Sequence, residues 1–226
     1  MSAAHRSGAP GVPVEVGTYK LASVLLQYPT AALFEGLDVL EATARHGPRA
    51  GREPLARFLG WLRDTDPTAV AQHYVQTFDL RRRCALYLTY YRYGDTRKRG
   101  MAMLRFKSAY RRARFVPTDG ELPDYLPLVL EFAALAPAGV ALLGSCRPDL
   151  ELLRRALHQA DSPYADVIEA VCAQLPKLHK REQELVREHW ADGPPQEEVG
   201  LEPFAPPEYL GTGYGATADQ GGGQPR

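Results

Sequence analysis

Little in this sequence of 226 residues is suited to catalysis. Its three cysteines, Cys84, Cys146 and Cys172, are odd in number and widely spaced, so they form neither a CxxC pair nor a disulfide framework, and a reducing compartment is expected. The GxSxG motif, the phosphate-binding loop and the dinucleotide fingerprint are all missing. The 27 cationic side chains equal the 27 anionic ones, so the whole-chain charge favours neither nucleic acid nor a membrane surface. We therefore expect a protein that is not an enzyme and has no cofactor of its own.

The chain also lacks a long uninterrupted apolar run. Residues 1–16 contain no apolar core of the kind that a signal peptide needs. The most apolar window, Pro127–Cys146, includes Glu131, Pro137 and Gly139, which suits a pair of buried helices and not a membrane span. The expected location is the cytoplasm, without stable insertion into a membrane.

Histidine and cysteine chemistry has little support. His179 and His189 are not at the i, i+4 spacing of a helical metal site, and no carboxylate motif completes a site around them or around His73. The arginines Arg81–Arg83 could make the neighbouring Cys84 thiol reactive. The alternative is a plain, half-buried cysteine.

Helical signals, by contrast, recur along most of the chain. Apolar residues repeat at i, i+3, i+4 and i+7 from Thr18 to Trp190, and strand signals are few. The pattern predicts an all-α, single-domain bundle of about eight to ten helices over residues 17–192. Residues 1–16 are expected to be flexible, and the Pro/Gly-rich tail 193–226 to be partly disordered.

Some helix boundaries are predicted from local chemistry. Thr18 is expected to cap the first helix, and Asp66-Pro67 has the residues of an N-cap followed by a first helical position. The stretch Leu86–Tyr93 would suit a strand by composition, but its neighbours favour a helix. One long helix is expected over Tyr164–Leu178, with a kink at Pro176.

The most informative segment is ELPDYLPLVLEF, residues 121–132. Its two prolines can lie in or near a first helical turn, and Glu121 and Asp124 lie where the helix dipole favours negative charge. Apolar residues then recur at helical spacing, at Leu126, Val129, Leu130 and Ala133. We expect one helix to begin here and to present a surface that holds a partner.

A basic stretch runs from Arg81 to Arg114. It contains ten arginines and two lysines, interleaved with aromatic residues that can stack on bases: Tyr87, Tyr90, Tyr91, Tyr93, Phe106 and Tyr110. Three interpretations stay open: a solvated helix face, a site for a phosphate-bearing ligand, and a nucleic-acid-binding surface formed by residues 81–114.

Three segments together, HYVQTFDLRRR, YGDTRKRGMAML and ELPDYLPLVLEF, resemble a known family. They are similar to the respiratory nitrate reductase assembly chaperones of the NarJ type, within the TorD/DmsD-like family that matures molybdenum-containing reductases. The similarity extends from LASVLLQYP to the last helix and PPEYL. The matching positions are Tyr74, Phe78-Asp79, Gly94, Arg97, Arg99-Gly100, Ala102-Met103, Glu121 to Asp124, Leu126-Pro127 and Leu130-Glu131.

The resemblance implies an all-helical, cytoplasmic chaperone that is not part of the final enzyme. Such proteins hold the N-terminal peptide of the apo catalytic subunit of nitrate reductase and assist insertion of the molybdenum guanine dinucleotide cofactor. Arg97 and Arg99 are expected to contact phosphates of that cofactor. The expected peptide-binding residues form an apolar groove with an acidic rim: Tyr74, Phe78, Asp79, Leu86, Tyr90, Glu121, Asp124, Leu126, Leu130 and Glu131.

The chain departs from the family pattern near Gly94. Some relatives carry glutamate and histidine before this glycine, where Tyr90, Tyr91 and Tyr93 stand here, and an acidic residue in place of Lys98. A role that requires a histidine in this loop is therefore not transferred.

Overall fold

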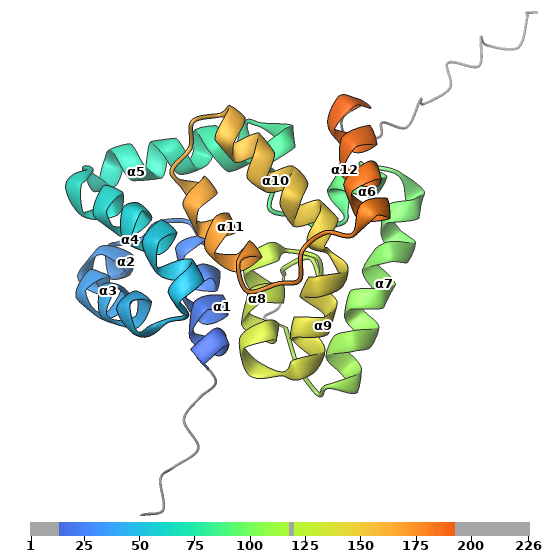
Figure 1. Ribbon diagram of the computed structural model, residues 1–226, viewed down its shortest axis with the longest axis horizontal. Coiled ribbons are helices and arrows are strands. Elements are labelled where there is room, and N and C mark those ends of the chain that lie inside the picture. The colour runs from blue at the N-terminus through green and yellow to red at the C-terminus, as the bar shows by residue number, and fades with distance from the viewer. Residues whose placement is uncertain (1–13, 118–119, 193–226) are drawn as a thin grey trace, which may run out of the picture. The chain divides into compact units, whose positions relative to one another are not determined.

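The structure, a computed structural model, describes residues 14–117 and 120–192 (Figure 1). These residues lie within one compact unit, Met1–Gln196, while a second unit, Glu197–Arg226, is outside them. The predicted tail 193–226 and most of the predicted flexible segment 1–16 are thus outside the described residues, although residues 14–16 already belong to the first helix.

The prediction of an all-α fold is confirmed, and the part of the chain described contains no strand. It contains twelve α-helices, more than expected, because short helices such as α2 and α6 have weak apolar periodicity. The helices are α1 (Val14–Leu25), α2 (Ala31–Glu35), α3 (Leu37–His46), α4 (Arg49–Asp64), α5 (Pro67–Tyr74), α6 (Tyr90–Tyr93), α7 (Arg97–Arg112), α8 (Leu126–Leu135), α9 (Pro137–Ser145), α10 (Arg147–Gln159), α11 (Tyr164–Cys172) and α12 (Lys180–Asp192).

Helix α8 forms the centre of the core, between α1 and α9 (Figure 1). Its sequence is apolar on every side, with Glu131 as its one charged residue, and such helices are buried all round. Leu126 and Leu130 are fully buried. Helix α9 approaches closely at Gly139, where an added Cβ would lie 2.4 Å from the carbonyl carbon and oxygen of Phe132. The expectation that α8 presents an open surface is therefore wrong.

Residues 122–125 form a turn, in which the Tyr125 amide donates to the Leu122 carbonyl at 3.0 Å, so the helix begins at Leu126 and not near Glu121. The Leu126 amide donates to the Leu86 carbonyl at 2.7 Å, and the Leu88 amide donates to the Asp124 carbonyl at 3.0 Å. The ambiguous stretch 86–93 therefore combines both predictions: its first half pairs like a strand with residues 124–126, and its second half forms α6.

Two predicted boundaries are wrong and one is confirmed. Helix α1 begins at Val14, so Thr18 lies within the helix and does not cap it, and the Thr18 residue is buried. The long helix over 164–178 ends at Cys172, so Pro176 follows the helix and does not kink it. The Asp66 cap is confirmed, because its Oδ1 accepts from the amides of Thr68 at 2.9 Å and Ala69 at 3.3 Å.

Candidate functional site

Helix α5 passes directly into a π-helical turn, Val75–Asp79. Such turns are rare and often occur at functional sites, because the wider turn changes which side chains face the core. Here Phe78 is buried whereas Asp79 and Leu80 are exposed. The turn thus ends with a carboxylate and an apolar side chain at the surface.

Four tyrosines from separate segments form a continuous cluster beside this turn. The Tyr28 and Tyr74 ring centroids are 5.5 Å apart, edge to face, and the Tyr87 and Tyr125 centroids are 5.6 Å apart. Burial, and then the nearby Tyr125 side chain, raise the pKa of Tyr74, which links the two pairs. We call Tyr28, Tyr74, Tyr125 and Tyr87 the tyrosine row.

Two exposed carboxylates flank the tyrosine row. Burial is the main cause that raises the pKa of Tyr87 and of Tyr125, and the charges of Glu121 and Asp79 raise both further. In the chain, Asp79 directly follows Phe78, whose ring packs on Tyr74, and Glu121 stands four residues before Tyr125. The outer surface of the row is aromatic and acidic, which suits cationic and apolar side chains of a partner.

A buried polar cluster supports the row from beneath. Asp124 Oδ2 accepts from the Thr89 amide at 3.2 Å and from the Thr89 hydroxyl at 2.5 Å, and it lies 3.6 Å from Arg99 Nη2. The Arg99 guanidinium lies 5.4 Å from the Tyr87 ring centroid and 5.9 Å from that of Tyr90. These contacts tie Thr89 and Arg99 to Asp124, next to Tyr87 and Tyr125 in the sequence or in space.

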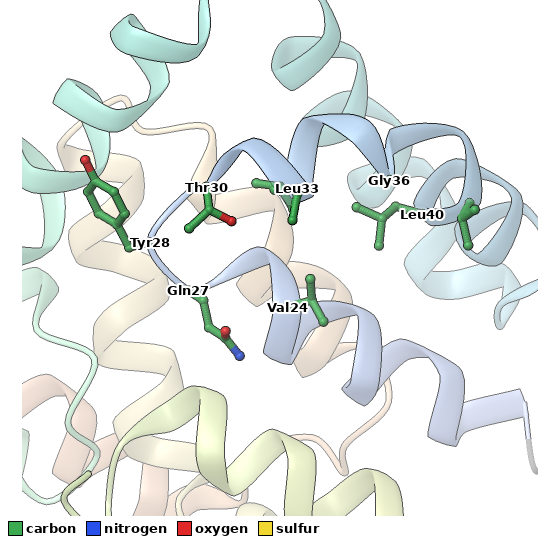
Figure 2. Close-up of a pocket in the computed structure, with 9 residues that line it drawn as sticks. Val24, Gln27, Tyr28, Thr30, Leu33, Gly36 and Leu40 are labelled. Atoms are coloured by element: carbon green, nitrogen blue, oxygen red, sulfur yellow. The ribbon is translucent and has the colours of Figure 1, made fainter. Parts of the chain in front are cut away.

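A pocket of about 450 Å³ opens at the Tyr28 end of the row (Figure 2). It lies between the end of α1, the loop that follows, α2 and the start of α3. Tyr28 is 53% exposed and Val39 is 70% exposed, so apolar surface is available there. The lining residues are Val24, Gln27, Tyr28, Thr30, Ala32, Leu33, Gly36, Val39 and Leu40.

The predicted peptide-binding residues separate into an exposed and a buried set. Asp79 and Glu121 are exposed beside the tyrosine row, and Glu131 is half-buried elsewhere, 2.5 Å from Lys20 Nζ. The buried residues cannot line an open groove in this conformation, which corrects that expectation: Tyr74, Phe78, Leu86, Tyr90, Asp124, Leu126 and Leu130. Their role in binding a peptide stays a prediction.

Sequence reasoning missed Tyr28, Val39 and Tyr125 as accessible site residues. Tyr125 lies inside the segment that the sequence singled out, and Tyr28 directly precedes the proline that follows the first helix. Aromatic residues next to a helix end were the available signal for the two tyrosines, whereas Val39 lies within α3 and carried no such signal.

The arginines of the basic stretch differ in availability. Arg99 is paired internally with Asp124 and lies 3.3 Å from Asp95, so its charge is largely offset. Arg97 is exposed at the start of α7. The aromatic residues on which a nucleic acid would stack are mostly buried, which argues against that interpretation of residues 81–114: Tyr90, Tyr91, Phe106 and Tyr110.

Catalytic and metal chemistry has no geometric support in the described ranges. Burial raises the pKa of the Cys84 thiol to about 11, although Arg81 acts in the opposite direction, so the thiol is not activated. His73 Nε2 lies 2.8 Å from the Ser162 hydroxyl, and its ring stacks on Tyr164. Within residues 14–117 and 120–192, no group of His, Cys, Asp and Glu side chains could hold a metal ion, and no helix is long and apolar enough to cross a membrane.

Comparison with known proteins identifies relatives over most of the helical unit. The family described as "Nitrate reductase delta subunit" matches residues 46–170. The "Probable nitrate reductase molybdenum cofactor assembly chaperone NarJ" of Bacillus subtilis is 36% identical over 168 residues, which cover 73% of this chain and 91% of NarJ. The corresponding NarJ of Escherichia coli K12 is 35% identical over 150 residues, 64% of each chain.

Two further similarities differ in kind. The "Nitrate reductase-like protein NarX" of Mycobacterium tuberculosis H37Rv is 44% identical over 156 residues, which cover 68% of this chain but 24% of NarX. The chain thus spans about a quarter of that relative. A crystal structure described as that of a "Putative Redox Enzyme Maturation Protein" from Archaeoglobus fulgidus has a TM-score of 0.54 at 22% identity. The similarity covers 75% of this chain and 97% of that one, and it shows the same fold.

Proposed function

The chain belongs to the nitrate reductase delta subunit family, and from this premise we propose that it is an assembly chaperone for a nitrate reductase. In this proposal it binds the N-terminal peptide of the apo catalytic subunit in the cytoplasm. It holds the subunit while the molybdenum cofactor is inserted, and it leaves before the enzyme works. The relatives named as assembly chaperones support this role, and their names describe no catalytic activity.

The observation that carries the peptide proposal is the continuity of the tyrosine row with the pocket at Tyr28. An amphipathic peptide helix can place one apolar side chain in the pocket, between Tyr28 and Val39, and a second against Tyr125. Cationic side chains on the same peptide would then lie near Asp79 and Glu121. The two ends of the surface thus select a peptide that is both apolar and basic.

The magnitudes favour a releasable complex. Two apolar anchors contribute about 3–6 kcal/mol, at 1.5–3 kcal/mol each. Two exposed ion pairs add about 0.4–2 kcal/mol. Association consumes roughly 4–15 kcal/mol, so even the most favourable sum leaves about 4 kcal/mol, which corresponds to a roughly millimolar complex, and a micromolar complex needs further contacts. Modest affinity suits a chaperone that must let its client go.

Calorimetric titration with the N-terminal peptide of the catalytic subunit tests the proposal. Val39→Asp and Glu121→Lys each change an exposed side chain, so folding should be preserved. We expect Val39→Asp to weaken binding by about tenfold or more, because it places a charge where an apolar anchor would lie. Val116→Asp is the matched control, since Val116 is 86% exposed and lies outside the pocket. Equal affinity of the wild type and both site variants would remove this surface from peptide binding.

Contact with the molybdenum guanine dinucleotide cofactor is a separate, finer proposal. Arg97 suits a phosphate better than Arg99, because the Arg97 side chain is exposed whereas that of Arg99 is mostly buried. Retention of cofactor by the chaperone–client complex should therefore fall in Arg97→Ala. Unchanged retention in that variant would exclude this arginine as a phosphate contact.

A further inference from the structure

Helix α7 and the residues directly after it carry a strong positive charge, which acidic residues elsewhere in the chain balance in the total. Residues 97–117 contain eight cationic side chains and no acidic one, although the chain as a whole has no net charge. Two of the eight are accounted for by contacts: Arg99 by Asp124 and Asp95, and Arg105 by a hydrogen bond of 3.3 Å to the Ser145 hydroxyl. No ion pair is found within the described ranges for five others: Lys98, Lys107, Arg111, Arg112 and Arg114.

The same helix exposes two large apolar side chains in the middle of its charged face. Met101 is 71% exposed and Leu104 is 53% exposed. At 100° per residue they lie on the side of α7 opposite to its buried residues, Phe106 and Tyr110. Arg97 and Lys98 precede them and Arg111 and Arg112 follow them along the helix, so cations enclose the apolar pair at both ends.

The helix lies along an edge of the helical unit, where a flat surface can reach it (Figure 1). Its inner side packs on α9, as the Arg105–Ser145 bond shows. After its C-terminus the chain exposes a third apolar side chain, Val116, beside Arg114. Apolar and cationic groups therefore continue past the end of α7.

We propose that the outer face of α7 binds reversibly to the surface of an anionic lipid bilayer. Lysine and arginine side chains near such a surface are attracted to its negative potential, and apolar side chains among them enter the boundary between headgroups and acyl chains. A lipid surface fits better than a nucleic acid, because the accessible side chains between the cations are Met101 and Leu104. The aromatic rings of α7, which could stack on bases, face the core. The proposed lipid-binding face is basic and apolar, whereas the tyrosine row is aromatic and acidic. The lipid proposal therefore does not depend on the peptide site.

Flotation of the full chain with lipid vesicles tests this. The probes are vesicles of pure phosphatidylcholine and vesicles of an equal mixture of phosphatidylcholine and phosphatidylglycerol, at low and at physiological salt. We expect flotation with the anionic vesicles only, weaker at higher salt. Arg111→Ala with Arg112→Ala should lower the partition coefficient about thirtyfold, since each cation contributes close to one factor of five. Met101→Ser with Leu104→Ser should lower it as well, because lipid contact uses apolar groups.

Matched controls keep the result interpretable. Lys180→Ala with Arg181→Ala removes the same charge from the exposed start of α12 and should leave flotation unchanged. All four substituted α7 residues are partly or fully exposed, and circular dichroism checks that each variant is folded. Failure of the wild type to float with anionic vesicles at low salt would overturn the proposal. An equal loss of flotation in the α12 control would overturn it too. So would unchanged flotation of the serine variant together with displacement of the protein from the vesicles by a DNA oligonucleotide, because that result would identify a general polyanion-binding surface.

Discussion

The buried carboxylate of Asp124 offers the sharpest test of how the tyrosine row is held. The Asp124→Ala variant removes the acceptor of two Thr89 hydrogen bonds and leaves the Arg99 guanidinium without its buried partner. Removing one member of a buried ion pair costs about 3–5 kcal/mol. Arg99 keeps Asp95 at 3.3 Å and retains some exposure, so we expect the free energy of unfolding to fall by about 3 kcal/mol.

Urea denaturation of a double-mutant cycle measures this coupling. Arg99→Met alone should also destabilise the protein, because it leaves Asp124 charged and buried. The double variant has no unpaired charge, so its loss should be smaller than the sum of the single losses by about 1–3 kcal/mol. Asp95→Ala is the control, since Asp95 is the exposed partner of the same arginine and should cost less than about 1 kcal/mol. Additive single effects, or an Asp124→Ala loss no larger than that of Asp95→Ala, would refute the role assigned to the buried pair.

Two further predictions concern packing and pH. Gly139→Ala should lower the unfolding free energy by about 2–3 kcal/mol in urea titration, because its Cβ would lie 2.4 Å from the backbone of Phe132. Gly144→Ala on the same helix has nothing within 4 Å and should be neutral or slightly stabilising, so equal effects would contradict this account. Burial tends to raise the pKa of Glu151, but Arg154, Arg155 and Arg147 lower it from 4.5 to about 2. The unfolded chain then binds the proton more tightly, so this carboxylate stabilises the fold fully above pH 4.5 and loses that effect as the pH falls toward 2, by at most about 3 kcal/mol. In Glu151→Gln the pH dependence of thermal unfolding over this window should be weaker, and an unchanged profile would exclude the mechanism.

Local chemistry sufficed wherever a few adjacent residues decide the structure. The Asp66 cap depends on one carboxylate and two amides directly after it, so the sequence predicted it correctly. The apolar stripe through Leu126 and Leu130 likewise predicted a helix there. The start of α8 could not be predicted locally, because residues 124–126 pair with residues 86–88, and that pairing depends on tertiary contact.

Exposure was harder to predict than helicity. The stripe in α8 suggested one buried face, yet Leu128 and Phe132 lie outside that stripe and are buried as well. A helix with apolar residues on every side is central to a core, and this signal was present in the sequence. Of the residues that match the family pattern, some are therefore buried in the core and others are exposed at the surface. Tyr74 and Phe78 support Tyr28 from within, while Asp79 reaches the surface through the π-helical turn, which no periodicity of 3.6 residues predicts.

The net charge of the chain is zero, but its positive and negative side chains are not evenly distributed over the surface. Charges at the surface act over about 8–10 Å in physiological salt, so a partner is affected only by residues near its contact. Beside the tyrosine row these residues include Asp79 and Glu121, whereas the outer face of α7 has cations without an acid between Arg97 and Pro117. Whole-chain neutrality thus does not exclude an anionic partner, and the lipid proposal rests on the distribution of charge along residues 97–117. If both surfaces bind as proposed, raising salt should weaken lipid flotation through α7 more than peptide binding, because the peptide site combines its two carboxylates with an apolar pocket.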